Sequence, residues 1–322
     1  RGANFKCILS GTAMDSEYIK NEGKKGNMGQ KLICIVAKGR KGKLYLNPST
    51  EQENIAKAAQ PSWRPDNKIF GSSQYLGIKP YGMDRFDQLF TSRQLLGLTT
   101  FSDLIGDVNK IIREDFIKNF SKRSNLSEGL IEEATSYANS VCLYLSFAIS
   151  RLADYNSSIS TWKPSGQQVM HTFTRAAIQM TWDFPESNTF GSSSICWTNC
   201  IKYTSNNLLS ISNSSKVKGF VLQDDAQTQN ISSNKIISTD PPYFDNIPYA
   251  DLSDFFYVWL RKSLKGIYPG LFATIASPKE GELIAAQYRH GDKDKAEKFF
   301  LNGMKNAINN LSINDVFKIT VG

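Results

Sequence analysis

The sequence predicts an α/β fold in which an incomplete parallel sheet is combined with an inserted β-rich segment and a helical region. Three observations lead to this expectation. The carboxyl-terminal part alternates short apolar runs with helical periodicity, the order typical of parallel strands with covered faces. The middle of the chain has two long helical patterns, and the amino-terminal part has a hairpin pattern.

Residues 1–60 are expected to form a basic, β-rich segment. Two apolar runs at 31–39 and 43–47 are joined by glycine and basic residues and predict a hairpin. After Pro48, a start made of Ser, Thr and Glu predicts the amino terminus of a helix.

Residues 61–160 are expected to form a helical region. Its first part, up to residue 86, is rich in Pro, Gly and aromatic residues, which is typical of an ordered connection. Helical periodicity then covers 91–120 and 127–155. The second of these helices is mostly apolar, so we expect it to be central.

Residues 161–322 are expected to carry the sheet. The stretch 166–190 is expected to begin as a helix and to lead into a loop that carries Trp182, Asp183 and Glu186. A polar break is expected at 205–216. Strands are then expected at 218–227, which ends in acids, and at 235–243.

Helices and a further strand complete this part of the chain. The run at 250–264 has apolar residues on one face of a helix, and 294–312 is also helical in pattern. Residues 317–320 begin another strand. The resulting order of strand, helix and strand is what predicts the parallel sheet.

The composition is that of a globular protein, with 40% hydrophobic and 21% charged residues and a mean hydropathy of −0.35. The longest apolar run, at 140–150, is too short to span a membrane and fits a buried helix. The five cysteines are odd in number and scattered, and no signal-peptide pattern is present. We therefore expect no membrane partner, no disulfide framework and a cytoplasmic location.

Positive charge is concentrated near the amino terminus. The chain carries a net charge of +8, and residues 20–43 contain eight Lys and Arg against Glu22 alone. Clustered cations separated by glycines suit a sugar–phosphate backbone. We expect contacts to DNA from the side chains at four positions: Lys24, Lys25, Arg40 and Lys41. A solvated basic loop is the alternative.

The sequence Asp-Pro-Pro-Tyr at 240–243 predicts a binding site. Asp240 follows a predicted strand, where ligands of open α/β sheets bind. Pro241 and Pro242 lack N–H groups and prevent a helix, which leaves their carbonyls free to accept hydrogen bonds. A carboxylate and a rigid carbonyl match the two donors of a planar amino group, and Tyr243 offers a face for stacking. A Pro-Pro turn with a capping Asp is the alternative.

This region resembles a known catalytic motif. The stretch TDPPYFDNIPYADLSDFFYVWLRKSL is similar to the motif of DNA methyltransferases that methylate amino groups with S-adenosyl-L-methionine. Further stretches resemble, in order, a prokaryotic family of adenine-specific DNA methylases with a zinc ribbon: GANFKCILSGTAM, YIKNEGKKGNMGQKL, FTSRQLLGLTTFSDLI, RLADYNSSISTW, FTRAAIQMTWDFPESNTF and ASPKEGELIAAQYRHG. The resemblance implies a Rossmann-like sheet, present only in part.

The resemblance also implies roles for the tetrapeptide. An adenine would be flipped out of DNA, with its exocyclic amine held by Asp240 and the Pro241 carbonyl and its ring stacked on Tyr243. Pro242 would complete the rigid catalytic turn. Methyl transfer would be a direct displacement, which depends on positioning and charge stabilisation rather than on a metal or a covalent nucleophile.

Cofactor and substrate contacts are implied on either side of the tetrapeptide. In such enzymes an acid followed by Ala contacts the adenine of the cofactor, and Asp225 with Ala226 is the better match, with Asp224 as the alternative acid. A strand-end turn with solvated acids is the other interpretation. Three residues are expected to line the substrate pocket: Asp245, Asn246 and Tyr249. Loop capping explains Asp245 and Asn246 as well.

Two features of the family are missing from the sequence. No Phe-x-Gly-x-Gly loop follows a first strand, since the Phe-Gly pairs at 69–77 and 189–197 lack that context. The chain begins with Arg1 and stops in half a strand pattern, so we expect an internal piece whose main cofactor motif lies upstream and which is inactive alone. At Cys7, a knuckle-like sequence has Ser10 in place of a second cysteine, so no metal site is predicted.

Other functions fit parts of the same pattern. An RNA adenine or a protein glutamine amide presents a similar planar amine, although Asp rather than Asn at position 240 leans away from glutamine. A nucleic-acid-binding module that has lost catalysis would keep the basic segment and lack the cofactor.

Overall fold

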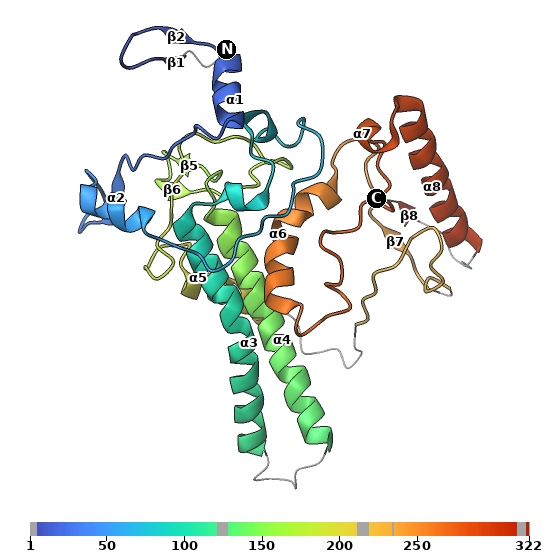
Figure 1. Cartoon of the computed structure of the whole chain (residues 1–322). Helices are drawn as coiled ribbons and strands as arrows, with labels where there is room; N and C mark the ends of the chain where they lie inside the picture. Colours follow the sequence, from blue (N-terminus) through green and yellow to red (C-terminus); the bar gives the residue numbers. More distant parts are fainter. Residues whose placement is uncertain (1–4, 121–127, 211–218, 234, 314–319, 322) are drawn as a thin grey trace. The chain divides into compact units, whose positions relative to one another are not determined.

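The computed structural model describes residues 5–120, 128–210, 219–233, 235–313 and 320–321, and it divides into two compact units (Figure 1). Unit 1 contains Arg1–Ser210 and Asp254–Ala276, and unit 2 contains Ile211–Ser253 and Ser277–Gly322. The predicted segments 1–60 and 61–160 thus fall in one unit, and 161–322 is divided between both. Among the described helices, none combines the length and apolar character that crossing a bilayer requires.

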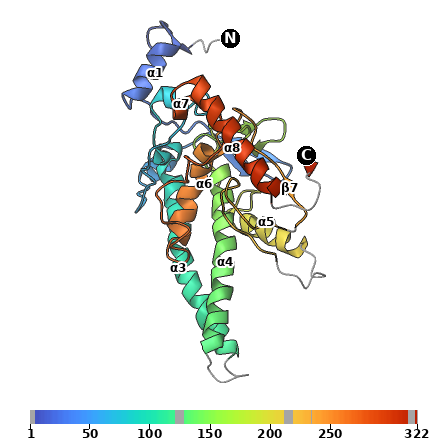
Figure 2. The same cartoon turned by 90° about the vertical axis from the view of Figure 1, so that its right-hand side faces the viewer.

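Two long helices form the centre of unit 1. Helices α3 (Ser92–Phe120) and α4 (Glu128–Tyr155) run antiparallel and side by side, as Figures 1 and 2 show, and both agree with the predicted helices. Along α4, buried residues recur every three or four positions, including Ala134, Ala138 and Cys142. Because α4 contacts α3 and also α5 (Trp197–Ser210), it is central as expected.

Helix α5 was not predicted. Its sequence is polar, but Cys200 is fully buried and the Arg151 guanidinium of α4 lies 3.6 Å from the centre of the Tyr203 ring. The expected break at 205–216 is therefore wrong as far as Ser210, and residues 211–216 lie outside the described part. A polar helix that buries only a few side chains shows little apolar periodicity in its sequence. Packing against α4 supplies the stabilisation that the local sequence of α5 does not.

The amino-terminal part mixes short strands and helices. The elements are β1 (Phe5–Lys6), β2 (Ala13–Met14), α1 (Ser16–Lys24), β3 (Ile35–Lys38), β4 (Lys43–Leu46) and α2 (Thr50–Lys57). The predicted hairpin is confirmed as β3–β4, and α2 begins after Ser49 with a capping box. Helix α1 was missed, although Asp15 caps it by accepting a 2.7 Å hydrogen bond from the Tyr18 N–H.

A glycine allows α1 to approach the connection that follows α2. That connection contains the 3₁₀ turns η1 (Lys79–Tyr81) and η2 (Phe86–Leu89). Gly23 of α1 is buried against η1, where a Cβ atom would lie 2.5 Å from the Tyr81 carbonyl oxygen. Only glycine fits this contact without moving the backbone.

The helix that was expected to open the stretch 166–190 does not form, so that prediction is wrong. The region contains β6 (Gln168–Val169), which pairs with β5 (Trp162–Lys163), and then turns. Its backbone donors bond to distant partners: the Thr172 N–H donates to the Asp154 carbonyl and the Ile178 N–H to the Tyr75 carbonyl. These tertiary bonds satisfy the groups that a helix would have used.

Three segments that are separate in sequence meet in a polar cluster of unit 1. The Glu186 carboxylate accepts a hydrogen bond from the Thr91 hydroxyl, and the Asn156 side-chain oxygen accepts from Gln94 Nε2 at 3.3 Å and from the Ser187 N–H at 3.1 Å. Gln94 and Asn156 are each 3% exposed. Glu186 therefore fixes its loop against the start of α3, which is a structural role.

Helix α6 (Tyr249–Leu264) agrees with its predicted position and supplies large side chains to the core of unit 1. Phe255 and Trp259 are fully buried. The Trp259 ring packs edge-on against Phe90 at 5.4 Å and Trp63 at 5.7 Å, measured between ring centres. These contacts anchor the carboxyl-terminal part of α6 in unit 1.

Unit 2 contains a parallel strand pair and the predicted carboxyl-terminal helix. Strands β7 (Ser238–Thr239) and β8 (Thr320–Val321) pair in parallel, and α7 (Gln287–His290) and α8 (Lys293–Ile313) lie between them in sequence. The described residues of the predicted strand 218–227 form no strand and make no ladder, and β7 is shorter than expected. A strand needs a neighbouring strand to bond its backbone N–H and C=O groups. Since β7 and β8 form a two-stranded sheet among the described residues, a larger Rossmann-like sheet stays a prediction.

We predict that Trp259→Ala destabilises the protein by about 3–5 kcal/mol, because it removes a fully buried aromatic side chain and leaves a cavity. Urea unfolding followed by circular dichroism measures the loss. The control is Trp182→Ala, since Trp182 is 46% exposed and should cost much less. Equal losses for the two variants would contradict this description of the core.

Candidate functional site

The tetrapeptide 240–243 lies directly between β7 and α6, within unit 2. The Asp240 side chain is exposed, and among the described residues it has no hydrogen-bond partner. The carbonyls of Pro241 and Pro242 likewise accept no backbone hydrogen bond within the described part. The Tyr243 side chain is 61% exposed. The acceptors and the ring that the sequence indicated are thus all open to a ligand.

Phe244, the residue after the tetrapeptide, fixes the tetrapeptide to the rest of unit 2. The Phe244 carbonyl accepts a 2.8 Å hydrogen bond from the Ala285 N–H, and the Phe244 ring packs edge-on against Phe300 of α8 at 5.2 Å. Phe300 belongs to a small core with Ala296 and Ala285. The two neighbouring aromatic residues therefore differ, since Phe244 packs on α8 with 39% of its surface exposed, whereas 61% of Tyr243 is exposed.

The predicted pocket residues follow immediately. Asp245 and Asn246 are exposed residues of the turn that begins at Tyr243, whose carbonyl accepts a 3.2 Å hydrogen bond from the Asn246 N–H. Tyr249 is the first residue of α6 and is 54% exposed. The structure therefore keeps these residues beside the tetrapeptide, as their spacing required, and their contact with a substrate stays a prediction.

The acid–alanine pair lies in a turn, and the described residues before it do not form the strand that the sequence predicted there. Asp225 and Ala226 lie at an exposed turn, and the Asp225 carboxylate accepts a 2.9 Å hydrogen bond from the Gln227 N–H. Asp224 in turn accepts from the Asp225 N–H at 2.9 Å. Asp225 therefore stabilises its own turn, and the cofactor contact stays a prediction.

Helix α8 holds this turn as well as the tetrapeptide. Asn310 Nδ2 donates to the Ala226 carbonyl at 3.3 Å and to the Gln229 carbonyl at 2.7 Å. Phe300, which anchors Phe244, lies ten residues earlier on α8 (310 − 300 = 10), a rise of about 15 Å along the axis. One rigid element thus carries both the candidate amine-binding loop and the candidate cofactor turn.

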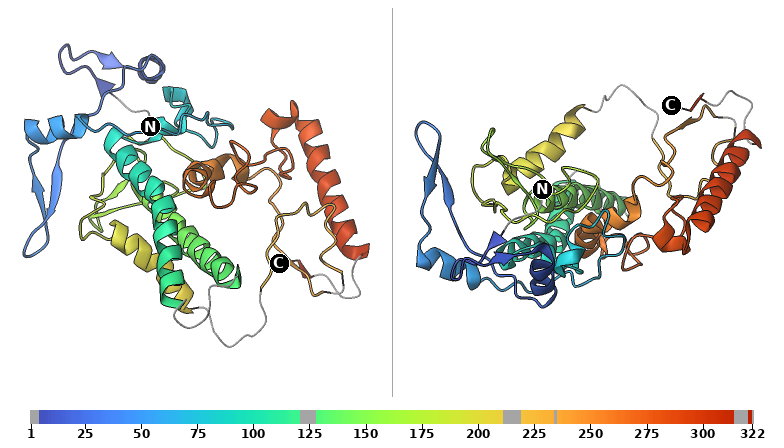
Figure 3. Two further views of the ribbon diagram at one scale, coloured as in Figure 1. Left: turned by 60° about the horizontal axis from the view of Figure 1, so that its bottom comes forward. Right: turned by 90° about the horizontal axis from the view of Figure 1, so that it is seen from above.

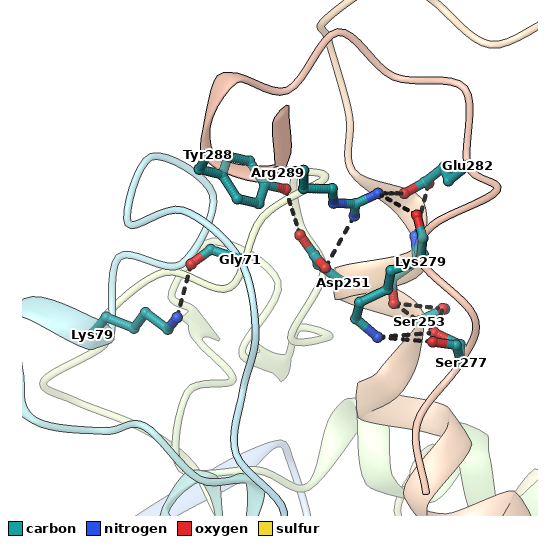
Figure 4. A network of polar contacts seen from close by, with 10 residues as sticks. Gly71, Lys79, Asp251, Ser253, Ser277, Lys279, Glu282, Tyr288 and Arg289 are labelled. Carbon is teal, nitrogen blue, oxygen red and sulfur yellow. Dashed lines mark hydrogen bonds and ion pairs between the residues drawn. The ribbon is translucent and has the colours of Figure 1, made fainter. Parts of the chain in front are cut away.

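The sequence did not predict an ionic network at the start of α6, which is centred on a buried carboxylate (Figure 4). The Arg289 guanidinium lies 3.0 Å from one oxygen of Asp251 and 2.7 Å from an oxygen of Glu282. The Tyr288 hydroxyl donates to the other Asp251 oxygen. Asp251 is 1% exposed, so this carboxylate is fully removed from water.

The environment of the network shifts two pKa values. Burial, followed by the hydrogen bond to Asp251, raises the pKa of the Tyr288 hydroxyl, which keeps it protonated as a donor. Burial opposes the charge of Arg289, but the bonds to Glu282 and Asp251 outweigh it and raise the pKa of the guanidinium. A sequence signal existed, because Asp251 lies four residues before Phe255 and eight before Trp259, on the buried face of α6.

The four predicted DNA-contacting residues lie on two elements of unit 1. Lys24 and Lys25 end α1, and Arg40 and Lys41 occupy the turn between β3 and β4. All four are exposed, and Figure 3 shows the β3–β4 hairpin as a two-stranded ribbon. Lys25 pairs with Glu22 at 2.8 Å, whereas no ion pair is found for the other three within the described residues.

Cys7 occupies the turn between β1 and β2. The Ser10 side chain, then the Ser10 and Leu9 N–H groups, donate toward its sulfur and lower the pKa of the thiol. Gly11 closes the turn with a φ of 69°. Within the described ranges, no group of three or more His, Cys, Asp or Glu side chains is arranged to hold a metal ion.

We predict that Cys7 reacts with iodoacetamide much faster than Cys200. The Cys7 thiol is accessible and has a lowered pKa, whereas burial raises the pKa of Cys200 to about 11, which leaves about one thiolate in a thousand at pH 8. Time-resolved labelling with peptide mass spectrometry measures both rates. In denaturant the difference should disappear, and equal rates in the folded protein would contradict the structure.

Known protein families, curated proteins and solved structures were compared with the chain, and none of them matches it. The relationship to adenine-specific DNA methylases therefore stays a prediction that rests on the motifs in the sequence and on the geometry of the tetrapeptide.

Proposed function

We propose that this chain is part of an S-adenosyl-L-methionine-dependent methyltransferase that modifies the N6 amine of a flipped adenine in DNA. The observation that carries the proposal is the exposed tetrapeptide, in which Asp240, the proline carbonyls and the Tyr243 ring remain open while Phe244 is anchored. A buried or self-paired Asp240 would have pointed to a structural turn instead.

The residues of the tetrapeptide have complementary tasks. The Asp240 carboxylate and the Pro241 carbonyl accept the two N–H groups of the amine, and Tyr243 stacks on the base. Holding both N–H groups aims the nitrogen lone pair at the methyl donor. Methyl transfer would form the N–C bond while the bond between the methyl group and the sulfonium sulfur breaks, and a neutral thioether would leave. Asp240 would stabilise the positive charge that develops on the nitrogen, and the proton that the nitrogen loses would pass to this carboxylate or to water.

The residues of this chain fit the cofactor only in part. S-adenosyl-L-methionine supplies an electrophilic methyl group on a sulfonium, and Asp225 with Ala226 offers it a carboxylate and a fixed turn. The Asp225 carboxylate already accepts the Gln227 N–H, and no glycine-rich loop is present. The proposal therefore places the main cofactor contacts in sequence outside this chain, and the protein in the cytoplasm with its DNA.

The basic hairpin supports a nucleic-acid substrate. A two-stranded ribbon fits the major groove of DNA, and the β3–β4 ribbon ends in Arg40 and Lys41. Its turn is closed by the Gly39 N–H, which donates to the Gly42 carbonyl at 2.7 Å. The charges are thus presented at the tip of a regular element, and Lys24 adds a second point of contact.

A nucleic-acid-binding module without catalysis is the second candidate. It is favoured by the Asp225 turn, in which the carboxylate bonds to its own backbone, and by the shortness of the β7–β8 pair. RNA adenine and protein glutamine amides are alternative substrates of the same tetrapeptide. Transfer assays with DNA, RNA and protein separate these cases.

We predict that Asp240→Ala in the full-length protein lowers methyl transfer to DNA by about 10³-fold or more, because it removes one of the two acceptors for the amine. Transfer of labelled methyl groups measures the rate, and DNA affinity should change by less than about twofold. The control is Glu280→Ala, which removes another exposed carboxylate of unit 2. Unchanged transfer by the Asp240 variant would refute the assignment.

We predict that replacing Lys24, Lys25, Arg40 and Lys41 together by Gln weakens DNA binding and flattens its salt dependence. Each lost phosphate contact reduces the magnitude of the negative slope of log K against log salt by about 0.9, so the loss of all four should reduce it by about 3.6. Fluorescence anisotropy at several salt concentrations measures the slope. The matched control replaces four other exposed lysines of unit 1: Lys110, Lys118, Lys163 and Lys202. The same slope in both variants would make the segment a solvated loop.

A further inference from the structure

The Arg289 guanidinium joins the start of α6 to residues 279–282 within unit 2 (Figure 4). Its Nη2 atom lies 3.0 Å from Asp251 at the start of α6, and its Nη1 atom lies 2.7 Å from Glu282. Nη1 also donates to the Lys279 carbonyl at 3.1 Å. The planar fork of arginine reaches these partners together, which the single ammonium of lysine cannot do.

The charges of Asp251 and Arg289 depend on each other. Asp251 is 1% exposed and the Arg289 side chain is 12% exposed. A buried charge that loses its partner is strongly unfavourable, so each residue holds the other in place. The Tyr288 hydroxyl completes the set by donating to the second oxygen of Asp251.

Glu282 extends the network to the backbone of α6. The Oε1 atom of Glu282 accepts a 2.9 Å hydrogen bond from the Ala250 N–H and thereby caps the helix, while its Oε2 atom is paired with Arg289. The Ser277 hydroxyl donates to the Ala250 carbonyl at 2.8 Å. Both backbone groups of Ala250 are therefore held by the segment 277–290.

The segment 277–290 also holds the other end of the loop that connects the tetrapeptide to α6. The Ala285 N–H donates to the Phe244 carbonyl at 2.8 Å. Phe244 directly follows the tetrapeptide, and Ala250 lies in the first turn of α6. The segment 277–290 thus clamps both ends of the stretch that carries the predicted pocket residues, and the Arg289 guanidinium fixes the α6 end of that clamp.

We propose that Arg289 is a positioning residue: through Asp251 and Glu282 it sets the first turn of α6 and, with it, the location of the tetrapeptide 240–243. The catalytic consequence rests on the proposed methyltransferase function, whereas the effect on the loop does not. Arg289 itself touches no reacting group in this proposal. A displacement of about 1 Å in such a loop is enough to lower a rate by about 100-fold.

The test uses the full-length protein with Arg289→Met, which keeps the bulk of the side chain, and Arg289→Lys, which keeps the charge. For Met, kcat for methyl transfer to DNA should fall by about 10- to 100-fold, with KM for DNA within about twofold. Arg289→Lys keeps one ion pair, so its kcat should lie between that of Arg289→Met and that of the wild type. Lys295→Met is the matched control, because it breaks the exposed pair with Asp292 in the same unit and should change neither value.

Hydrogen exchange in the absence of DNA and cofactor provides a readout independent of activity. In Arg289→Met, amides of residues 244–251 should exchange about tenfold faster, while those in the middle of α8 should keep the wild-type rate. If exchange and kcat both match wild type, the proposal is overturned. If α8 accelerates as much as 244–251, Arg289 only stabilises unit 2 and the proposal is also overturned.

A milder variant covers the case in which Arg289→Met does not fold. Glu282→Gln keeps an oxygen for the Ala250 N–H and removes the charge that pairs with Arg289. It should show the same two effects at smaller size, and wild-type kcat with wild-type exchange would overturn the proposal. If the wild-type protein transfers no methyl group, the proposed function fails, and the exchange experiment alone decides whether Arg289 positions the loop.

Discussion

The pairing of Arg289 with Asp251 is the interaction on which the candidate site depends. A carboxylate that is 1% exposed is stable only with a charged partner, and losing one partner of such a pair typically costs about 3–5 kcal/mol. The pair brings the segment 277–290 against the first turn of α6, and the same segment binds the Phe244 carbonyl. The exposed tetrapeptide is therefore supported by a buried ionic contact that no reacting group needs to touch.

Most of the regular structure could be predicted where local pattern and tertiary packing agree. Helices α3, α4, α6 and α8 follow apolar periodicity, and α2 follows its capping sequence after Ser49. The residues proposed for the site are contiguous, so Asp240 and Tyr243 lie together in any fold, and their role in binding a substrate stays a prediction. The helix expected at the start of 166–190 does not form, because bonds such as the one from the Thr172 N–H to the Asp154 carbonyl replace the helical ones.

What the sequence could not predict are contacts between distant residues. The spacing of Asp251 from Phe255 and Trp259 indicates that Asp251 is buried, but nothing in the linear sequence pairs it with Arg289, which follows in a later segment. Asp225 is a comparable case, since its carboxylate bonds to the Gln227 N–H and Asn310 of α8 fixes the next carbonyl. Helix α5 needs the surface of α4 to bury Cys200. In each case a partner far along the chain selects the local conformation.

Nucleoside analysis tests the central claim most directly. The full-length protein is incubated with unmethylated DNA and S-adenosyl-L-methionine, the DNA is digested, and the nucleosides are identified by mass spectrometry. The account predicts N6-methyladenine as the product, absent when Asp240 is replaced by Ala. DNA that is bound but unmodified, or a methyl group found only on RNA or on a protein glutamine, would contradict it.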